Sequence, residues 1–498
     1  MRFTQNKYLP YGVLALLSVP LFFLNIHDVH SWGDDFAQYI KEAQNIAHGK
    51  PFYQSGYIYN PHNTEYAPAQ YPPGFPLLLA PVVKIWGIAI RPMLYMVTII
   101  SVCLLFALFE YFRKYMSVIT AVCLSLAIIY NSFMVDLKGN ILSDIPCLLF
   151  VVLYLTTRNA TFFSWRRILL LIFFAVMAIL MRSQAILLLA AEGIYLILSL
   201  LKSILKNKRF SMQFLYKSPV LYIIAGSLLV NFILNKTLFY SPIRTDAFYN
   251  QFVKQTIHGN LRDIAEANIY RLLPNCSAFL YYESNNGFLR TAISIAQSIA
   301  IAFSITGFIV CISKRLAVDD IFFILMSLLI IFLPVHDLRY FLPALPILFF
   351  YCYTTFKIVL PAIIKGDLRW AAILLTLIYL RMGYSHLEKA AEVVPSGCIP
   401  QASDLVAFRY ISQHVNDQDI IVFTKPRLLT LYSNKRSINT AWQISPEMNK
   451  KIFDSLQVKY MLIVDGLDDG YFKDYLRNIQ HPVDSVRFGG RYTLYSLR

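Results

Sequence analysis

The sequence predicts a mainly α protein, in which a polytopic bundle of about 11 transmembrane helices precedes a small α/β domain. Hydrophobic residues make up 57% of the 498 residues and charged residues only 15%, whereas about a quarter of the residues of a soluble protein are charged. The apolar residues form blocks of about 17 to 22, the length that a helix needs to cross the hydrocarbon of a bilayer. After residue 384 the apolar runs become short, which predicts a separate soluble fold.

The basic residues predict the side of the membrane that each loop faces, because cytoplasmic loops carry an excess of Lys and Arg. Arg2 and Lys7 precede the first apolar block, so we expect a cytoplasmic N-terminus. Under this rule the stretch 71–90 begins and ends outside, and its prolines interrupt a regular helix. We therefore expect it to lie in the interface. The predicted spans are 11–27, 92–112, 117–135, 145–160, 168–181, 184–201, 219–235, 291–312, 320–335, 341–361 and 370–383.

Two domains follow from this topology. Residues 1–384 are expected to form the membrane domain, in which 28–90 is the first external loop with its interfacial helices. Residues 385–498 are expected to form an extracytoplasmic α/β domain, long enough to have a core of its own. Its predicted strands are 419–424, 459–464 and 492–497, and its predicted helices are 404–414 and 446–456. We expect a multi-pass protein of a bacterial plasma (inner) membrane.

Charge and motifs exclude several function classes. The formal net charge is +16, but most Lys and Arg lie between apolar blocks, where they fix topology and contact anionic lipid. No basic domain with interleaved aromatic residues is present, so a nucleic-acid partner is not expected. Neither a P-loop motif nor a dinucleotide-binding glycine motif occurs in the sequence. A sugar donor, if one is used, would therefore be tethered in the lipid.

Four segments on the predicted outer face resemble the motifs of one enzyme family. They are Gly33–Ile40 (GDDFAQYI), Tyr71–Pro76 (YPPGFP), Ser143–Pro146 (SDIP) and Arg339–Pro343 (RYFLP). In this order they resemble the GT-C fold glycosyltransferases, which include the protein O-mannosyltransferases and the lipid A aminoarabinose transferases. The chain departs from that pattern at Asp35, where Glu is common, and at Tyr71, where His is commoner. These departures leave the substrate class open.

The resemblance implies transfer of a sugar from a polyprenyl-phosphate-linked donor to a glycan, lipid or protein acceptor on the outer face, with inversion. Each buried methylene of the carrier contributes about 0.8 kcal/mol to its retention in the membrane. The carrier therefore stays in the bilayer, and the enzyme must bring its catalytic base to the interface. A divalent metal ion is left open as a cofactor, because no compact cluster of oxygen ligands occurs in the sequence.

The acids of these motifs are the expected catalytic groups. Asp34 is expected to be the general base that takes the proton of the acceptor hydroxyl, and Asp35 is the second catalytic candidate. Asp144 is expected to orient the acceptor or to hold a metal ion. The alternative for each acid is a structural one, the N-cap of the helix that follows it.

Cations and aromatic residues complete the expected site. Arginine suits the leaving phosphate through its bidentate fork, although an arginine at this depth can also snorkel to lipid phosphates. Tyrosines at this density also form interfacial belts. The expected donor-phosphate residues are Arg339, Arg182, Tyr340 and Lys138, and the expected substrate-pocket residues are Tyr57, Tyr59, His62, Tyr71 and His336.

Two other functions are open at this point. A lipid-linked glycan flippase or transporter would show paired halves with charges near mid-membrane, but the polar features here gather at one face. A glycan polymerase or ligase would share the outer-face site, typically around a large late loop, and the loop 236–290 carries few acids or histidines. The glycosyltransferase hypothesis requires the paired aspartates, Asp144 and Arg339 to converge on one cavity.

Overall fold

The structure is a computed structural model of the 498-residue chain. It describes residues 7–31, 33–60, 62, 70–159, 164–207, 218–242, 262, 265–266, 268, 287–332, 338–363, 370, 372–374, 376–377, 380–381, 398–440, 444–466, 469–488 and 490–497.

Residue contacts divide the chain into two compact units. The first unit comprises Met1–Ile26, Leu94–Leu238 and Lys254–Val393, and the second comprises His27–Met93, Phe239–Val253 and Val394–Arg498. The second unit therefore joins most of the predicted first external loop to the predicted C-terminal domain. Residues more than 300 positions apart in the sequence share one fold there.

Helices make up most of the described part of the first unit. The predicted spans from 11–27 to 341–361 correspond to these helices, and residues 370, 372–374, 376–377 and 380–381 of the predicted span 370–383 are also helical. The helices are α1 (Leu9–Ser18) with η2 (Val19–Phe22), α4 (Ile90–Phe112, which starts in the second unit), α5 (Val118–Ile129), α6 (Ser132–Lys138), α7 (Asp144–Arg158), α8 (Trp165–Met181), η3 (Ser183–Ile186), α9 (Leu187–Asn207), α11 (Pro219–Lys236), α14 (Gly287–Lys314), α15 (Val318–Phe332), η5 (Leu338–Ala344) and α16 (Leu345–Ile363).

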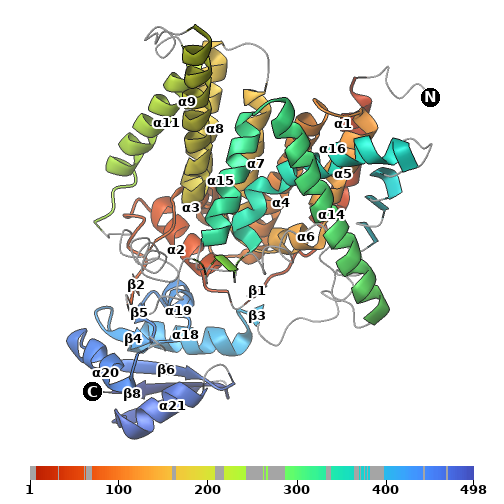
Figure 1. The fold of residues 1–498 in the computed structure, drawn as a ribbon. Coiled ribbons are helices and arrows are strands. Elements are labelled where there is room, and N and C mark those ends of the chain that lie inside the picture. Colours follow the sequence, from red (N-terminus) through yellow and green to blue (C-terminus); the bar gives the residue numbers. More distant parts are fainter. Residues whose placement is uncertain are drawn as a thin grey trace. The chain divides into compact units, whose positions relative to one another are not determined.

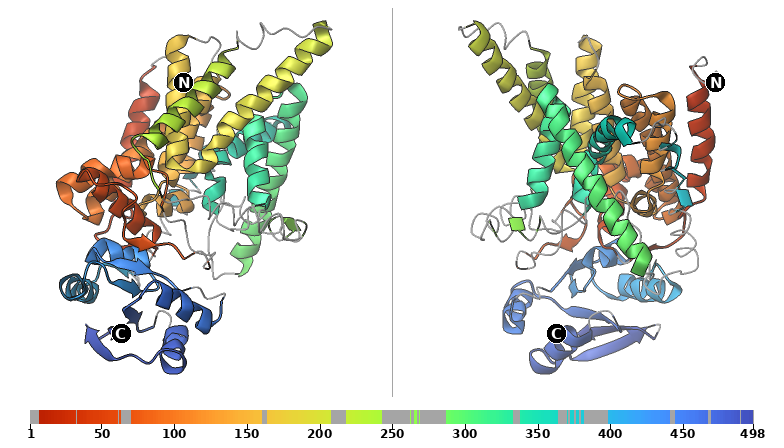
Figure 2. Two further views of the ribbon diagram at one scale, coloured as in Figure 1. Left: turned by 90° about the vertical axis from the view of Figure 1, so that its left-hand side faces the viewer. Right: turned by 45° about the vertical axis from the view of Figure 1, so that its right-hand side comes forward.

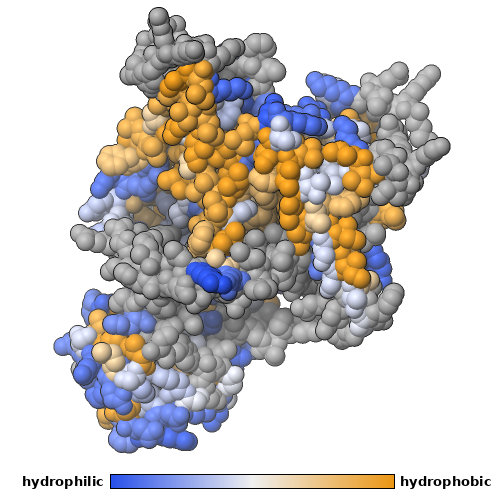
Figure 3. All heavy atoms as spheres, in the orientation of Figure 1, coloured by the Kyte–Doolittle hydropathy of each residue, from blue (hydrophilic) through white to orange (hydrophobic). Residues whose placement is uncertain are grey.

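Several of these helices are long and apolar enough to cross a bilayer. Five satisfy both conditions among the described residues, and a sixth span is present if α5 and α6, bent by 59° at their junction, count as one. Apolar side chains lie over the helices in Figure 3 (orange), and large ones are exposed, such as Leu169 on α8 and Phe232 on α11. Such a surface suits lipid rather than water. The chain is an integral membrane protein, and the count of about 11 spans stays a prediction.

Close packing between α14 and α16 explains one glycine. The 28-residue helix α14 (green in Figure 2) runs without a break. A Cβ atom added at Gly307 would lie only 1.9 Å from the carbonyl oxygen of Tyr351 on α16. Only a residue without a side chain lets the two helices approach so closely.

The second unit contains a six-stranded mixed sheet in the order β2-β5-β4-β6-β8-β7. Strands β2, β5, β4 and β6 are parallel neighbours, and β6, β8 and β7 are antiparallel neighbours. The C-terminal strands and helices are blue in Figure 1. The strands are β2 (Tyr57–Ile58), β4 (Ile420–Val422), β5 (Arg436–Ile438), β6 (Tyr460–Val464), β7 (Asp484–Phe488) and β8 (Tyr492–Ser496), and the separate pair is β1 (His30–Ser31) with β3 (Cys398–Ile399).

Six helices lie within the described residues of the second unit. They are α2 (Asp35–Ala47), α3 (Gly74–Trp86), α18 (Ala402–His414), α19 (Pro426–Ser433), α20 (Pro446–Ser455) and α21 (Asp469–Asn478). With 13 residues, α3 is about 20 Å long. The hydrocarbon core is about 30 Å thick, so α3 alone does not cross it, and the interfacial placement of the stretch 71–90 stays a prediction.

The core of the α/β part explains which predicted strands are found. Ile420 and Val422 of β4 are buried together with Met461 and Ile463 of β6 and Phe453 of α20. A strand buried on both faces reads as a continuous apolar run, and the predicted strands 419–424, 459–464 and 492–497 correspond to β4, β6 and β8. The predicted helices 404–414 and 446–456 correspond to α18 and α20. Strands β2, β5 and β7 and helices α19 and α21 were not predicted.

Candidate active site

Asp34 lies at the N-cap position of α2, but its side chain makes no capping bond to that helix. Instead Oδ1 of Asp34 accepts a hydrogen bond of 3.0 Å from the backbone N–H of Leu428, in the first turn of α19. The side chain is 7% exposed. The structure therefore turns this carboxylate away from its own helix and toward a helix that begins almost 400 residues later.

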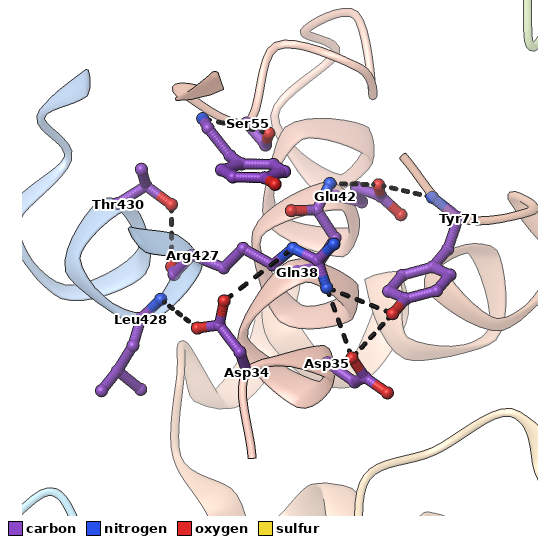
Figure 4. A network of polar contacts seen from close by, with 10 residues as sticks. Asp34, Asp35, Gln38, Glu42, Ser55, Tyr71, Arg427, Leu428 and Thr430 are labelled. Atoms are coloured by element: carbon purple, nitrogen blue, oxygen red, sulfur yellow. Dashed lines mark hydrogen bonds and ion pairs between the residues drawn. The ribbon is translucent and has the colours of Figure 1, made fainter. Parts of the chain in front are cut away.

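Arg427 is the centre of this cluster (Figure 4) and is 1% exposed. Its Nη1 lies 3.3 Å from Oδ1 of Asp35 and 3.1 Å from the hydroxyl oxygen of Tyr71, and its Nε lies 4.0 Å from Oδ2 of Asp34. The guanidinium carbon lies 4.9 Å from the ring centroid of Tyr57 and 5.2 Å from that of Tyr71. One buried cation is thus held by two carboxylates and two aromatic rings.

The two aspartates differ in their surroundings. The side chain of Asp35 is 31% exposed, more than four times the exposed fraction of Asp34. Oδ1 of Asp35 also accepts a hydrogen bond of 2.7 Å from the hydroxyl of Tyr71. Burial raises the pKa of Asp34 to about 6, although Arg427, Lys425 and the Leu428 N–H oppose this shift. Asp34 is therefore a buried anchor, and Asp35 is the acid that solvent reaches more readily.

Glu42 lies on the same helix as the aspartates and is fully buried. Its Oε1 accepts hydrogen bonds of 2.7 Å from Nε2 of Gln38 and 3.2 Å from the backbone N–H of Tyr71. Burial raises the pKa of Glu42 to about 8, despite these two hydrogen bonds and the charge of Arg427. At neutral pH this carboxyl group is therefore mostly protonated, and it fixes the backbone just before α3 rather than balancing Arg427.

The other residues expected to line the substrate pocket differ in how deeply they are buried. Tyr57 is buried against Arg427, whereas Tyr59 is half-buried and His62 is exposed. His336 lies outside the described residues. Tyr57 and Tyr71 thus contact a buried cation, which differs from the lipid-facing belt considered as their alternative.

A second cluster, in the first unit, contains three other expected residues. Asp144, the first residue of α7, forms an ion pair with Arg182, which directly follows α8; their side chains are 2% and 15% exposed. The guanidinium carbon of Arg182 lies 5.0 Å from the ring centroid of Tyr340. Nε2 of Gln184 donates a hydrogen bond of 3.2 Å to the carbonyl oxygen of Tyr340. The structure thus brings Asp144, Arg182 and Tyr340 together.

The other two expected donor-phosphate residues have different environments. Arg339 lies in η5 and is half-buried. Lys138 is buried, and its Nζ donates to the carbonyl oxygen of Leu24 and lies 3.5 Å from Oγ1 of Thr98. Within the described part of the chain, no group of three or more His, Cys, Asp or Glu residues is placed to hold a metal ion. Convergence of the two clusters on one cavity stays a prediction.

Arg427 is the residue that the sequence did not single out. It follows Lys425 and Pro426 in a short helix of the C-terminal region and lies 392 positions from Asp35. Nothing in its local sequence indicates a partner. A weaker signal was present on α2, because Asp35, Gln38 and Glu42 recur at helical spacing and so share one face.

We expect the substitution Glu42→Gln to stabilise the protein increasingly as the pH rises from about 4 to about 8. A carboxyl group whose pKa is higher in the folded state than in the unfolded state lowers the free energy of unfolding as the pH rises from the unfolded to the folded pKa, and the full loss remains above that range. Glutamine keeps the acceptor oxygen for Gln38 and Tyr71, and because it does not ionise, it removes this pH-dependent loss of stability. Thermal unfolding in detergent at pH 5 and pH 8 measures the effect, and an equal difference from wild type at both pH values would contradict it.

Comparisons with known proteins agree with the motifs. Residues 70–225 match the family model described as dolichyl-phosphate-mannose-protein mannosyltransferase. No match to a curated protein was found. Among solved structures, ArnT from Cupriavidus metallidurans bound to undecaprenyl phosphate is similar, with a TM-score of 0.57, 11% identity and 99% of each chain covered.

Two other solved structures are similar over nearly the whole chain. The oligosaccharyltransferase of Archaeoglobus fulgidus in its apo form has a TM-score of 0.58 and 12% identity, with 94% of this chain and 71% of that chain covered. The arabinofuranosyltransferase AftD from mycobacteria has a TM-score of 0.56 and 12% identity, with 99% of this chain and 40% of that chain covered. The predicted resemblance is confirmed: the chain has the GT-C glycosyltransferase fold and matches the mannosyltransferase family model over residues 70–225.

Proposed function

We propose that the protein transfers a sugar from a polyprenyl-phosphate-linked donor to an acceptor on the outer face of the membrane, with inversion at the anomeric carbon. The observation that carries this proposal is the partly exposed carboxylate of Asp35, held by Tyr71 and Arg427 in the loop after the first membrane helix. The N-terminus is cytoplasmic and the α/β region is extracytoplasmic in this proposal, in accordance with the distribution of Lys and Arg.

Asp35, rather than the more buried Asp34, is the general base. An acceptor hydroxyl oxygen attacks the anomeric carbon and forms the new glycosidic bond, while the bond from that carbon to the donor phosphate oxygen breaks. The hydroxyl proton passes to the Asp35 carboxylate, and polyprenyl phosphate leaves. A carboxylate is a weak base for a free alcohol, but it becomes effective as the proton acidifies in the transition state.

The leaving phosphate gains negative charge as the bond breaks, and Arg182 binds it. Its guanidinium is anchored from one side by Asp144 and lies over the ring of Tyr340, which pre-organises the fork for a phosphate. Arg339, the neighbour of Tyr340 in η5, supplies a second positive charge. Asp144 therefore positions Arg182 in this proposal.

Two aspartate variants test the base. We expect Asp35→Asn to lower kcat by about 10²- to 10⁴-fold, the usual contribution of a general base. Asp34→Asn keeps an oxygen that can accept from the Leu428 N–H, so we expect it to lose less activity. Transfer from a radiolabelled polyprenyl-phosphate sugar measures both, with size-exclusion profiles in detergent as the control for folding. Wild-type transfer by Asp35→Asn would rule out this base.

Two variants test the phosphate site. Arg182→Lys keeps the charge beside Asp144 but loses the planar fork, and we expect the KM for the donor to rise roughly 10-fold or more. Arg262→Lys is the matched control, because Arg262 is 81% exposed and forms an ion pair with Glu266 one helical turn away. An unchanged donor KM in Arg182→Lys, or an equal rise in the control, would contradict the assignment.

A further inference from the structure

The sheet of the second unit has the topology of a ligand-binding α/β fold. The parallel strand β4 lies between β5 and β6, and the chain after β4 leads through α19 to β5 on one side before β6 is added on the other. In open parallel sheets, ligands bind at the carboxyl ends of the strands where the strand order reverses. The N-terminus of a helix that starts there also attracts anions.

A carboxylate of the chain itself lies at this place. Helix α19 begins with Pro426 just after β4, and the N-cap residue Lys425 makes no side-chain capping bond. The carboxylate of Asp34 accepts from the Leu428 N–H instead, beside the guanidinium of Arg427. Asp34 thus lies where an anionic ligand would bind in this type of fold.

Three further contacts fix the loop of the paired aspartates to the C-terminal part of the chain. Strand β2 extends the sheet as a parallel neighbour of β5. Nδ2 of Asn60 donates 3.1 Å to the carbonyl oxygen of Asn439, and Nζ of Lys41 donates 2.6 Å to Oδ1 of Asn434. These contacts leave α2 and its first residues little freedom relative to α19.

We propose that Arg427 is a positioning residue, through which the C-terminal part of the chain fixes the Asp34–Asp35 pair and keeps Asp35 ionised for proton transfer. The inference rests on the proposed function, because it takes Asp35 as the base. Arg427 touches Asp35 directly and is too buried to contact the donor. A fixed cation beside a carboxylate favours its charged form.

The other charged and titratable groups near Asp35 do not replace Arg427. Asp34 is itself a carboxylate, and the Tyr71 hydroxyl donates to Asp35 without carrying a charge. His30 of β1 is buried, and burial lowers its pKa to about 4, so it is neutral near pH 7. Lys425 is among the charges that act on Asp34. Of these groups, Arg427 is the one that places a positive charge within hydrogen-bonding distance of the Asp35 carboxylate.

The test compares Arg427→Met, Arg427→Lys and Arg436→Met in the full chain. Arg436 lies on β5 in the same part of the fold, and its Nη1 donates a hydrogen bond of 3.3 Å to the carbonyl oxygen of Gln418, so it controls for the loss of an arginine. We expect Arg427→Met to lower kcat roughly 10- to 100-fold and to move the acid limb of the kcat–pH profile to higher pH. Arg427→Lys should restore part of both, and Arg436→Met should change neither.

The possible results of this test separate the positioning role of Arg427 from the proposed function. If Asp35→Asn is inactive while folded Arg427→Met retains the wild-type kcat and pH profile, the positioning role is wrong and the proposed base stands. If Asp35→Asn is active, the proposed function fails first. A purely structural role would lower the yield of folded protein and leave the pH profile of the folded fraction unchanged. If Arg427→Met does not fold, Arg427→Lys decides, and a wild-type pH profile there overturns the inference.

Discussion

The burial of one guanidinium constrains the whole second unit. Removing a cation from water costs several kcal/mol unless charged and polar partners replace the lost hydration. Arg427 finds those partners in Asp34, Asp35 and Tyr71, which all come from the N-terminal fifth of the chain. The two segments therefore depend on each other: without the C-terminal region the two acids lose this counter-charge, and without the acids the buried arginine loses these two negative charges. This dependence explains why contacts group two distant segments into one unit.

Charge balance also separates the roles of three neighbouring acids. A single cation cannot compensate three neighbouring carboxylates. Glu42, which is fully buried and bonded to neutral donors, carries its proton at neutral pH because burial raises its pKa to about 8. Asp34 is buried but receives an N–H bond and lies near Arg427, so burial raises its pKa only to about 6. Asp35 alone combines the ion pair with partial exposure. The surroundings of these three acids, rather than their residue types, thus separate the structural acid Glu42 and the anchor Asp34 from the proposed base Asp35.

The sequence predicts the parts of this fold that depend on local patterns. Apolar blocks locate the helices of the first unit, and short apolar runs locate β4, β6 and β8. The bend between α5 and α6 was missed because Tyr130 and Asn131 interrupt the helix without proline or glycine. Strand β2 has two residues and exists only because β5 pairs with it. Arg427 was missed for the same reason. Its contacts are with residues 356 and 392 positions away in the sequence, and no local pattern indicates them.

The helix ends explain why the candidate groups lie where they do. A charged side chain in the middle of a membrane helix is costly, and the candidate groups lie where helices begin or stop. Asp35 and Asp144 are the first residues of α2 and α7, and Arg182 directly follows the last residue of α8. Helix dipoles favour negative charge at the N-terminus and positive charge at the C-terminus. The dipoles therefore stabilise the same charge states that proton transfer and phosphate binding require, and one arrangement serves both the fold and the proposed reaction.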